Sequence, residues 1–257
     1  PALRDTRHPM GRREDAKGEG VRQRMKVDLH VHTRERSGCA RASATEQIRA
    51  AVDAGLDVIA FTDHGQLQNA DDLARWNETH APLRILNGIE LTMEGEDVLV
   101  IGVADPALAT ETWTWPRLHG FVREHGGFLA VAHPFRYRSE IAVDIQGFPP
   151  DAIEVYSSNT PRAVDGQILE VARRMRIPVL CDSDAHDSRQ LGRYYNLLDE
   201  TPHDDRGIFT LLRRGAFTAV MREEDGGIKE IAQHAILDMN NDLSGRPRAV
   251  MAERQHG

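Results

Sequence analysis

The sequence predicts an α/β fold built around a parallel sheet, of a size that fits a single α/β barrel. The main observation is an alternation along the chain, in which short β-branched apolar runs are followed by longer segments with apolar residues at helical spacing. The second observation is the size of the chain. It has 257 residues, 40% of them hydrophobic, enough to bury one large core or a core with a small appendage.

The apolar runs predict seven strands, at 26–31, 57–61, 83–91, 98–103, 128–132, 152–156 and 178–181. The intervening segments predict helices at 45–54, 70–78, 116–125 and 162–174, with Ser43 and Thr45 as N-caps. The junction within 83–103 has little room for a helix, so its two runs are expected to form an antiparallel pair or a lone hairpin. Past His186, a helix is expected at 208–213 and a final strand at 216–221.

The chain divides into three parts. Residues 1–24 are polar, Arg-rich and without apolar periodicity, which predicts a disordered leader or a remnant upstream of the folded part. Residues 25–222 are expected to form the folded domain. Residues 223–257 are charged and weakly patterned, so we expect a C-terminal extension there.

Composition excludes several classes of protein. The formal net charge of -8 argues against bulk nucleic-acid binding, and no apolar stretch approaches the roughly 20 residues that span a bilayer. The N-terminus lacks the apolar core of a signal peptide. The two cysteines, Cys39 and Cys181, lack the paired spacing of a disulfide or zinc motif, so we interpret Cys39 as a loop residue and Cys181 as a buried strand residue. Together these features predict a cytoplasmic protein.

Histidines and acidic residues stand where the predicted strands end. His30 and His32 close the first strand, and because alternate strand residues share one face, both imidazoles can bind one ion. His64 follows the second strand and His133 follows the fifth. Asp184 and His186 follow the seventh, again two residues apart.

Glu90 differs because it lies inside an apolar run. A buried carboxylate without a partner costs several kcal/mol, and a nearby cation would remove that penalty. Each motif alone also fits a solvated histidine pair, a helix cap or a loop hydrogen bond. Taken together, five strand ends that converge on one face of a parallel barrel predict a metal site. Nitrogen and carboxylate ligands without thiolate suit zinc, manganese or iron.

The same residues form motifs in the order of a known family. They are DLHVHT at 28–33, FTDHG at 61–65, GIELT at 88–92, AHPFR at 132–136 and DSDAH at 182–186. The sequence thus resembles the polymerase and histidinol phosphatase (PHP) family of metallohydrolases over residues 26 to 220. The resemblance implies a distorted, TIM-like (β/α)7 barrel with up to three metal ions at the C-terminal face of the strands.

The resemblance also implies a ligand for each ion. His30, His32, Glu90 and Asp184 would hold one ion, with Glu90 bridging to a second ion that His133 helps to hold. His64 and His186 would serve a third. Many members have an Asp or His shortly after HxHT, whereas this chain has Arg34 to Cys39 there, which puts the third site in question. Asp97 stands where some members carry a histidine and is an additional candidate ligand.

The predicted function is hydrolysis of a small phosphorylated metabolite, nucleotide or short oligonucleotide by metal-activated water, with two or three divalent ions (Zn, Mn or Fe). Asp184, His64 and His186 are the candidate catalytic residues, and either histidine would donate a proton if the third ion were absent. Candidate substrate-binding residues are Arg136, Asn159, Arg162 and Arg193, because arginine forks match phosphate oxygens. Four aromatic residues are expected to line a substrate wall or to pack in the core: Trp113, Trp115, Tyr194 and Tyr195.

Two other functions remain open at this point. The same ions also polarise carbonyl groups, so the chain would equally suit hydrolysis of an amide or a cyclic ester. The barrel would otherwise be a non-catalytic accessory module. That alternative predicts missing ligands and a larger attached chain, whereas this sequence has nearly the whole motif set.

Overall fold

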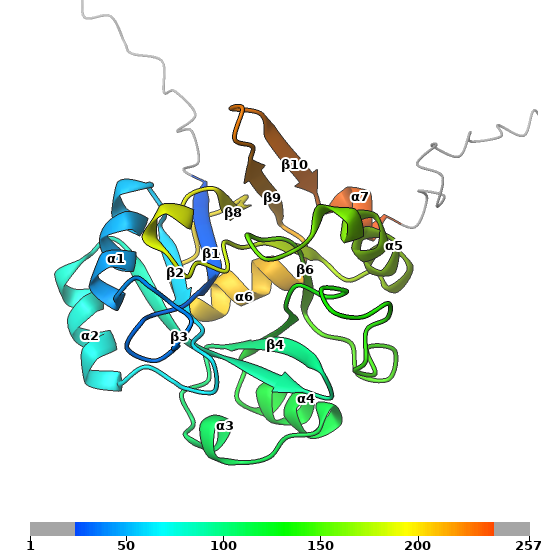
Figure 1. Cartoon of the computed structure of the whole chain (residues 1–257), viewed down its shortest axis with the longest axis horizontal. Helices are drawn as coiled ribbons and strands as arrows, with labels where there is room; N and C mark the ends of the chain where they lie inside the picture. Colours follow the sequence, from blue (N-terminus) through cyan, green and yellow to red (C-terminus); the bar gives the residue numbers. More distant parts are fainter. Residues whose placement is uncertain (1–23, 239–257) are drawn as a thin grey trace, which may run out of the picture.

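The computed structural model describes residues 24–238, whose centre is one mixed sheet curled into a nearly closed barrel with helices outside it (Figure 1). The strands are β1 (Met25–Val31), β2 (Val58–Phe61), β3 (Arg84–Met93), β4 (Glu96–Ile101), β5 (Phe128–Val131), β6 (Ala152–Tyr156), β7 (Val179–Cys181), β8 (Tyr194–Leu198), β9 (Phe217–Arg222) and β10 (Ile228–Ala232). Their order in the sheet is β10-β9-β8-β1-β2-β3-β4-β5-β6-β7.

Strands β1 to β7 correspond to the seven predicted runs and form the barrel wall. Their neighbours are parallel except around β4, which runs antiparallel to both β3 and β5. The antiparallel pair expected within 83–103 is therefore confirmed. The predicted distorted barrel is confirmed as well, and the antiparallel direction of β4 follows because only a short turn joins β3 to β4, whereas a parallel return needs a longer crossover.

The barrel closes where the chain after β7 meets β1. Val31 forms a parallel bridge with Ala185, and the backbone N–H of His32 donates to the carbonyl of Ala185 at 2.9 Å. Lower in β1, side chains replace backbone pairing: Ser183 N donates to Asp28 Oδ1 at 2.9 Å, and Leu29 N donates to Asp182 Oδ1 at 2.8 Å. This seam between β1 and the segment after β7 is thus held by both kinds of hydrogen bond.

Asn196 of β8 stands at the branch where the sheet leaves the barrel. Its Oδ1 accepts from the backbone of Cys181 at 3.0 Å, and its Nδ2 donates to Asp182 Oδ1 at 2.8 Å. From there β8, β9 and β10 continue as an antiparallel extension, and the β9–β10 hairpin projects from the body (Figure 1). The buried amide of Asn196 therefore joins the barrel to this extension.

The helices are α1 (Ala44–Asp53), α2 (Ala70–Thr79), α3 (Ala107–Thr110), α4 (Trp115–Glu124), α5 (Asp165–Met175), α6 (Asp205–Arg213) and α7 (His234–Leu237), with 3-10 turns η1 (Arg162–Val164) and η2 (Ser188–Gln190). Ser43 caps α1 through a capping box with Glu46, as predicted, whereas Thr45 lies inside the helix. None of the helices in residues 24–238 has the length and apolar character needed to cross a membrane.

Several elements differ from the sequence-based expectation. Strand β8 was missed; its Tyr194 and Tyr195 are buried strand residues, and Trp115 is fully buried in the core. Strand β10 and helix α7 fall within 223–257, where only weak patterning was expected. Residues 1–23 of the predicted leader and residues 239–257 lie outside the described residues.

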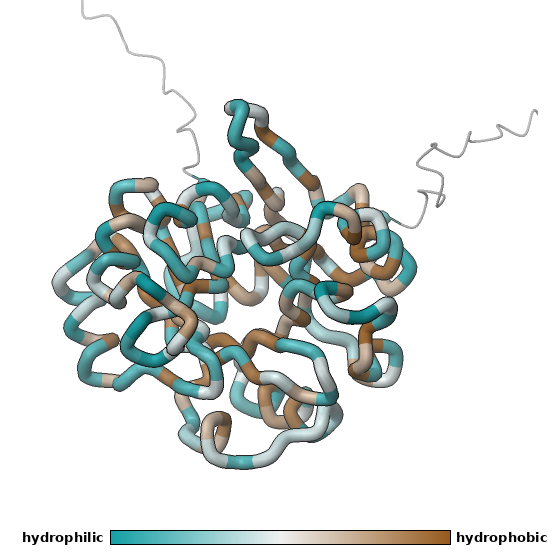
Figure 2. Tube along the Cα trace, viewed as in Figure 1, coloured by the Kyte–Doolittle hydropathy of each residue, from teal (hydrophilic) through white to brown (hydrophobic). Residues whose placement is uncertain are grey.

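The hydrophobic core fills the barrel and the spaces beneath the outer helices. Figure 2 shows hydrophobic stretches along the interior strands and hydrophilic stretches over the outer loops. A second cluster of buried side chains, which includes Ile48, Phe61 and Tyr195, packs between α1 and the sheet. Apolar burial of this extent fixes the strands and hence the positions of the residues at their ends.

We expect Gly88→Ala to destabilise the barrel. A methyl group on Gly88 would lie 2.9 Å from Thr62 Cγ2, 2.9 Å from Val100 O and 3.2 Å from Phe61 O, so packed backbone would have to move. Overpacking of this kind costs about 1 to 3 kcal/mol. Thermal unfolding would measure the loss. Gly120→Ala in α4 is the matched control, because its methyl group meets open space and alanine favours a helix.

Candidate metal centre

The seam brings the first and last ligand motifs together. His30 lies in β1 and His32 directly follows it, while Ala185 between Asp184 and His186 is bonded to this strand. The buried side chain of Gln47 on α1 strengthens the junction, since its Nε2 donates to the carbonyl oxygens of His32 at 2.9 Å and Ala185 at 3.1 Å. Residues far apart in sequence are therefore fixed side by side.

Glu90 comes from β3, which extends beyond the end of β2. The FTDHG loop runs alongside this extension: Gly65 N donates to Glu90 O at 2.9 Å, and Glu90 N donates to Asp63 O at 3.1 Å. These two bonds set the spacing between His64 and Glu90, and His64 Nδ1 lies 2.9 Å from Glu90 Oε2. Glu90 is 1% exposed although it carries a carboxylate.

His133 and Asp184 reach the centre from strained backbone. Their φ angles are 27° and 48°, in the left-handed region that residues with a β-carbon rarely adopt. Each such conformation costs about 1 to 3 kcal/mol and is retained where the surrounding structure enforces it. At His133 the backbone N–H donates to Glu154 Oε2 at 3.0 Å, which holds the strained residue in place.

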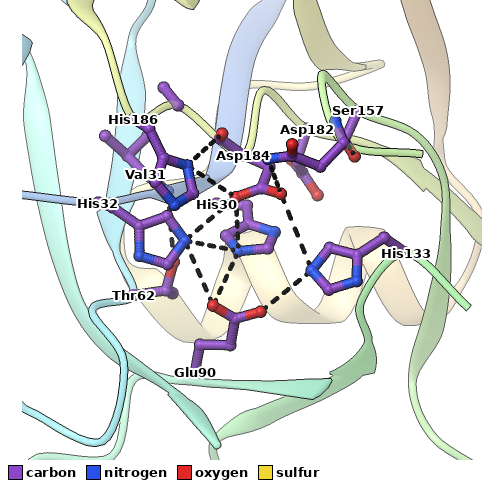
Figure 3. A network of polar contacts seen from close by, with 12 residues as sticks. His30, Val31, His32, Thr62, Glu90, His133, Ser157, Asp182, Asp184 and His186 are labelled. Carbon is purple, nitrogen blue, oxygen red and sulfur yellow. Dashed lines mark hydrogen bonds and ion pairs between the residues drawn. The ribbon is translucent and has the colours of Figure 1, made fainter. Parts of the chain in front are cut away.

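The side chains converge on one small volume (Figure 3). His30 Nε2 and His32 Nε2 are 3.0 Å apart, and Asp184 Oδ1 lies 3.4 Å and 3.1 Å from them, respectively. Glu90 Oε2 lies 3.5 Å from His30 Nε2 and 3.3 Å from His32 Nε2, and Glu90 Oε1 lies 3.2 Å from His133 Nε2. Four strands and the loops that follow them thus supply one cluster.

Within residues 24–238, these side chains form three overlapping groups that could each hold an ion: His30, His32 and Asp184; His30, Glu90 and His133; and His32, His64 and His186. The ligand atoms of each group lie within 4.8 Å of one another. His64 and His186 lie toward solvent, with 43% and 23% of their side chains exposed, while the others are buried. The seven predicted ligands are therefore together, with the third group nearest to solvent.

The protonation pattern fits cation binding. His30 Nδ1 lies 3.0 Å from Glu154 Oε1, so its proton belongs on Nδ1 and the lone pair on Nε2 points inward. His32 Nδ1 faces Ser37 Oγ, whose own proton goes to Asp63, so the inward Nε2 of His32 also carries a lone pair. Two lone pairs 3.0 Å apart repel each other unless a proton or a cation lies between them.

The pKa values of the buried residues also favour cation binding. Burial lowers the pKa of His32, while the pKa of His30 is raised well above its usual value because its carboxylate neighbours outweigh the effect of burial. For Glu90 and Asp184, burial opposes ionisation, but the surrounding imidazoles hold both pKa values below their usual range. Glu90 Oε2 is buried without a hydrogen bond of acceptable geometry, although three imidazole nitrogens lie near it. An acceptor left in this way fits a metal ligand.

Asp63 and Glu154 were not among the predicted site residues, yet both organise the site. Asp63 accepts from the backbone and hydroxyl of Thr33, from Ser37 Oγ at 2.6 Å and from Gln68 Nε2 at 2.6 Å. Glu154 accepts hydrogen bonds from the ring of His30 in β1 and from the backbone N–H of His133 after β5. The sequence held a signal for Glu154, since an acid inside the apolar run AIEVY resembles the case of Glu90.

Beneath the ligands, Asp28 and Asp182 form a buried pair of acids. Each uses Oδ1 to accept backbone hydrogen bonds across the seam, and each has an Oδ2 without a partner. Burial raises the pKa of Asp28 from 3.8 to about 7, and burial together with Asp28 raises the pKa of Asp182 well above its usual value. At neutral pH these acids therefore hold protons that ordinary aspartates have lost.

A cavity of about 710 Å³ opens over the ligand cluster. Arg136 and Asn159, two predicted substrate-binding residues, line it, as does Asp97. Asn159 Nδ2 donates to Asp184 Oδ2 at 2.6 Å. The carboxylate of Asp97 accepts from the Thr92 hydroxyl, and Asp97 is not a member of the three ligand groups found in residues 24–238.

The other two predicted arginines do not line this cavity. The Arg162 guanidinium stacks on the Tyr156 ring at 4.8 Å and contacts Met221 Sδ. Arg193 pairs with Glu224 at 3.0 Å and donates to the carbonyl of Arg222 at 3.1 Å. The two cysteines have the expected settings, with Cys39 exposed in a loop at the cavity and Cys181 buried in β7.

A barrel with buried ligand groups gathered at one end defines a metalloprotein of the α/β-barrel class. Residues 28–141 match the model of the PHP domain, and residues 166–217 match the model of the PHP-associated region. The chain belongs to the PHP domain family. With this ligand set it is a metal-dependent hydrolase of that family, and the compound it hydrolyses is addressed below.

Solved structures share the fold at low sequence identity. A two-domain protein from Bacteroides vulgatus, described as containing a predicted PHP-like metal-dependent phosphoesterase, is 16% identical with a TM-score of 0.61, covering 84% of this chain and 69% of its own. PsfC from Pseudomonas syringae is 23% identical (TM-score 0.54, covering 72% and 85%). An amidohydrolase from Chromobacterium violaceum with bound sulfate is 18% identical (TM-score 0.54, covering 73% and 96%). Among curated proteins, none gives a significant match.

Glu154→Gln is expected to weaken metal binding about 10- to 100-fold, the usual cost of losing a partner that orients a ligand. The amide would present a donor to either His30 Nδ1–H or the His133 backbone N–H, and both of these are donors themselves. Competition with a fluorescent chelator would measure the affinity. Glu154→Ala leaves both donors unpaired and should weaken binding further. Unchanged affinity in both variants, with folding verified by circular dichroism, would contradict this role.

Asp28→Asn should stabilise the metal-free protein at pH 8. The folded pKa of about 7 exceeds the ordinary 3.8, so the stability contributed by Asp28 is complete below pH 4 and is lost as the pH rises to about 7. The full loss corresponds to about 4 kcal/mol, which asparagine avoids while its Oδ1 still accepts from Ser183.

Thermal unfolding between pH 4 and pH 8, in the presence of a chelator, would test the Asp28 prediction. The melting temperature of the variant, relative to that of the wild type, should increase as the pH rises. Asp53→Asn at the exposed end of α1 is the matched control and should run parallel to the wild type. Parallel curves for Asp28→Asn as well would show that the Asp28 carboxyl does not titrate as described.

Proposed function

We propose that this chain is a phosphoesterase that hydrolyses a small phosphorylated metabolite, a nucleotide or a short oligonucleotide. The observation that carries the proposal is the overlap of three ligand groups beneath one cavity with an arginine at its wall. Shared ligands suit closely spaced ions, and phosphoryl transfer depends on positioning and on neutralising charge at the phosphoryl oxygens. Two or three divalent ions, Zn, Mn or Fe, are the proposed cofactors.

The proposed division of the ligands is the one that the family resemblance implies. His30, His32, Glu90 and Asp184 would hold the first ion, Glu90 and His133 the second, and His64 with His186 a third; all seven residues are members of the three overlapping ligand groups. When bound, such ions lower the pKa of a water molecule enough to supply hydroxide near neutral pH. The proximity of Glu90 Oε2 to three imidazole nitrogens supports its role as the shared ligand.

Proton transfer to the leaving group falls to the two histidines nearest to solvent. The Glu90 carboxylate, whose Oε2 lies 2.9 Å from His64 Nδ1, raises the pKa of His64 above its usual value, so a larger share of His64 is protonated at neutral pH. His186 also lies against the ring of His32, and its Nδ1 is 3.4 Å from Asp184 Oδ1. Either histidine can donate a proton where no third ion is bound. Asp184 would keep its carboxylate charge and orient these groups.

Substrate phosphate is proposed to bind Arg136. It lines the cavity three residues beyond His133 and makes no ion pair among residues 24–238, so its guanidinium is available to phosphate oxygens. Asn159 contributes indirectly, because its amide already donates to Asp184. Arg162 and Arg193 have their own partners away from the cavity and carry no part of this proposal.

The proposal is tested by elemental analysis of the purified protein combined with turnover of a panel of phosphomonoesters, nucleotides, short oligonucleotides, amides and cyclic esters. Bound Zn, Mn or Fe with turnover of phosphoesters is the expected result. Turnover of amides or cyclic esters alone would assign the metal centre to carbonyl chemistry. Bound metal without turnover of any compound would favour an accessory module.

His30→Ala and Asp184→Ala should lose metal and activity together, each by more than about 100-fold, because each removes a buried ligand of the first ion, and His30 is also shared by two ligand groups. His119→Ala is the matched control, since this exposed histidine of α4 contacts Pro149 and lies outside the ligand groups. Metal content by mass spectrometry and phosphoester turnover would be measured on the same samples. Normal turnover in either ligand variant would be incompatible with the assigned roles.

A further inference from the structure

Beyond the metal ligands, the cavity wall carries a distinctive set of charges. Three arginines, Arg41, Arg136 and Arg189, line it together with two aspartates, Asp97 and Asp187. A cavity of about 710 Å³ is in the range of pockets that enclose whole metabolites, and it is much larger than a phosphate group requires. Charged side chains on this wall that lack a partner within the protein are therefore available to bind the part of the substrate outside the reacting phosphate.

Arg189 and Asp187 cancel each other. The Arg189 Nε lies 2.8 Å from Asp187 Oδ1, and its Nη2 lies 2.9 Å from Oδ2, in a two-point pair. The pair holds the pKa of Asp187 at about 2, so both groups are charged at neutral pH and contribute no net charge to the cavity. The carboxylate of Asp97 accepts a hydrogen bond from the hydroxyl of Thr92. Of the three arginines, Arg41 and Arg136 are therefore the two without an acidic partner among residues 24–238.

The backbone of Arg41 is held by hydrogen bonds, whereas its guanidinium has no partner among the described residues. Its backbone N–H donates to His186 O at 2.7 Å, and its carbonyl accepts from Arg34 Nη1 at 2.9 Å. Its guanidinium makes no hydrogen bond or ion pair within the described part of the chain, and the residue is exposed. Arg136 is similar, since its guanidinium contacts only the face of Tyr137, whose ring is 76% exposed.

The two free arginines stand at opposite ends of a row of imidazoles. The ring of His133 is 5.7 Å from that of His30, which is 5.0 Å from His32, which is 4.3 Å from His186. Figure 3 shows His133 and His186 on opposite sides of the cluster. Arg136 follows His133 in the chain, whereas Arg41 is hydrogen-bonded to His186. The two arginines therefore join the cavity wall next to opposite ends of the row of ligands.

We propose that Arg41 forms a second anion subsite, so that the substrate is a phosphoester carrying another anionic group apart from the phosphate that reacts. This inference rests on the proposed phosphoesterase function. The reacting phosphate lies over the metal ligands beside Arg136, and the second group, a phosphate or a carboxylate, pairs with Arg41. A guanidinium binds either anion through two parallel hydrogen bonds, so its contribution depends on the second charge and is absent from a simple monoester.

The test compares matched esters on a three- to six-carbon alkyl chain: one with a terminal hydroxyl, one with a terminal carboxylate and one with a second phosphate. The metal-loaded wild-type protein is expected to have a kcat/KM at least about 10-fold higher for one of the charged esters than for the hydroxyl ester. The preferred terminal group identifies the anion. Arg41→Gln should bring that ratio down toward one, and Arg41→Lys should restore part of it.

The double variant Asp187→Asn, Arg189→Gln is the matched control. It removes a cavity-lining arginine together with the carboxylate that neutralises it, so the net charge of the cavity is unchanged and the ratio should stay within about 2-fold of wild type. A second measurement, independent of turnover, is calorimetric binding of an alkyl bisphosphonate against the alkyl monophosphonate. Arg41→Gln should selectively weaken the bisphosphonate.

The outcomes separate the two proposals. Turnover with equal kcat/KM for charged and uncharged esters would overturn the second subsite and leave the phosphoesterase assignment standing. The same ratio in wild type and Arg41→Gln would likewise overturn it. No turnover of any ester would overturn the phosphoesterase assignment, and selective loss of bisphosphonate binding in Arg41→Gln would then still support an anion subsite at Arg41.

Discussion

The structure depends on an electrostatic constraint: acidic and imidazole groups are buried together at the strand ends. His30 Nε2 and His32 Nε2 face each other at 3.0 Å, which requires a proton or a cation between them, and Glu90 Oε2 has no hydrogen bond of its own. Burial of such groups is costly unless a positive charge compensates it. The hydrogen bonds of Glu154 and Asp63 make the arrangement rigid, because they fix the ring protons on the outer side of the cluster.

This rigidity explains the strained backbone. His133 and Asp184 adopt left-handed conformations, and both stand where a strand has just ended and the chain must turn a side chain inward. Glu154 accepts a hydrogen bond from the backbone N–H of His133, and Asn159 donates one to the side chain of Asp184. Strain concentrated at ligand positions is typical of sites that are organised before the ligand arrives. The cluster therefore has little need to rearrange when a cation binds.

The sequence was sufficient for the seven barrel strands and for the side chains that gather in the cluster, because each of these residues stands in or beside a strongly apolar run that forms a buried strand. It was insufficient where the signal depends on distant partners. Strand β10 reads IKEIA and is largely exposed, so only its pairing with β9 defines it. The setting of Arg162 likewise depends on tertiary contacts that the sequence does not reveal, because its guanidinium stacks on the ring of Tyr156 and does not line the cavity.

The seam between β1 and the segment after β7 has a consequence for biosynthesis. Its two sides lie at residues 28–32 and 182–185, so a growing chain completes neither the barrel nor the ligand cluster until nearly three quarters of the described residues have been made. A cation bound by both His30 and Asp184 would link β1 to the segment after β7. Metal supply would then act on the stability of the closed barrel as well as on its chemistry.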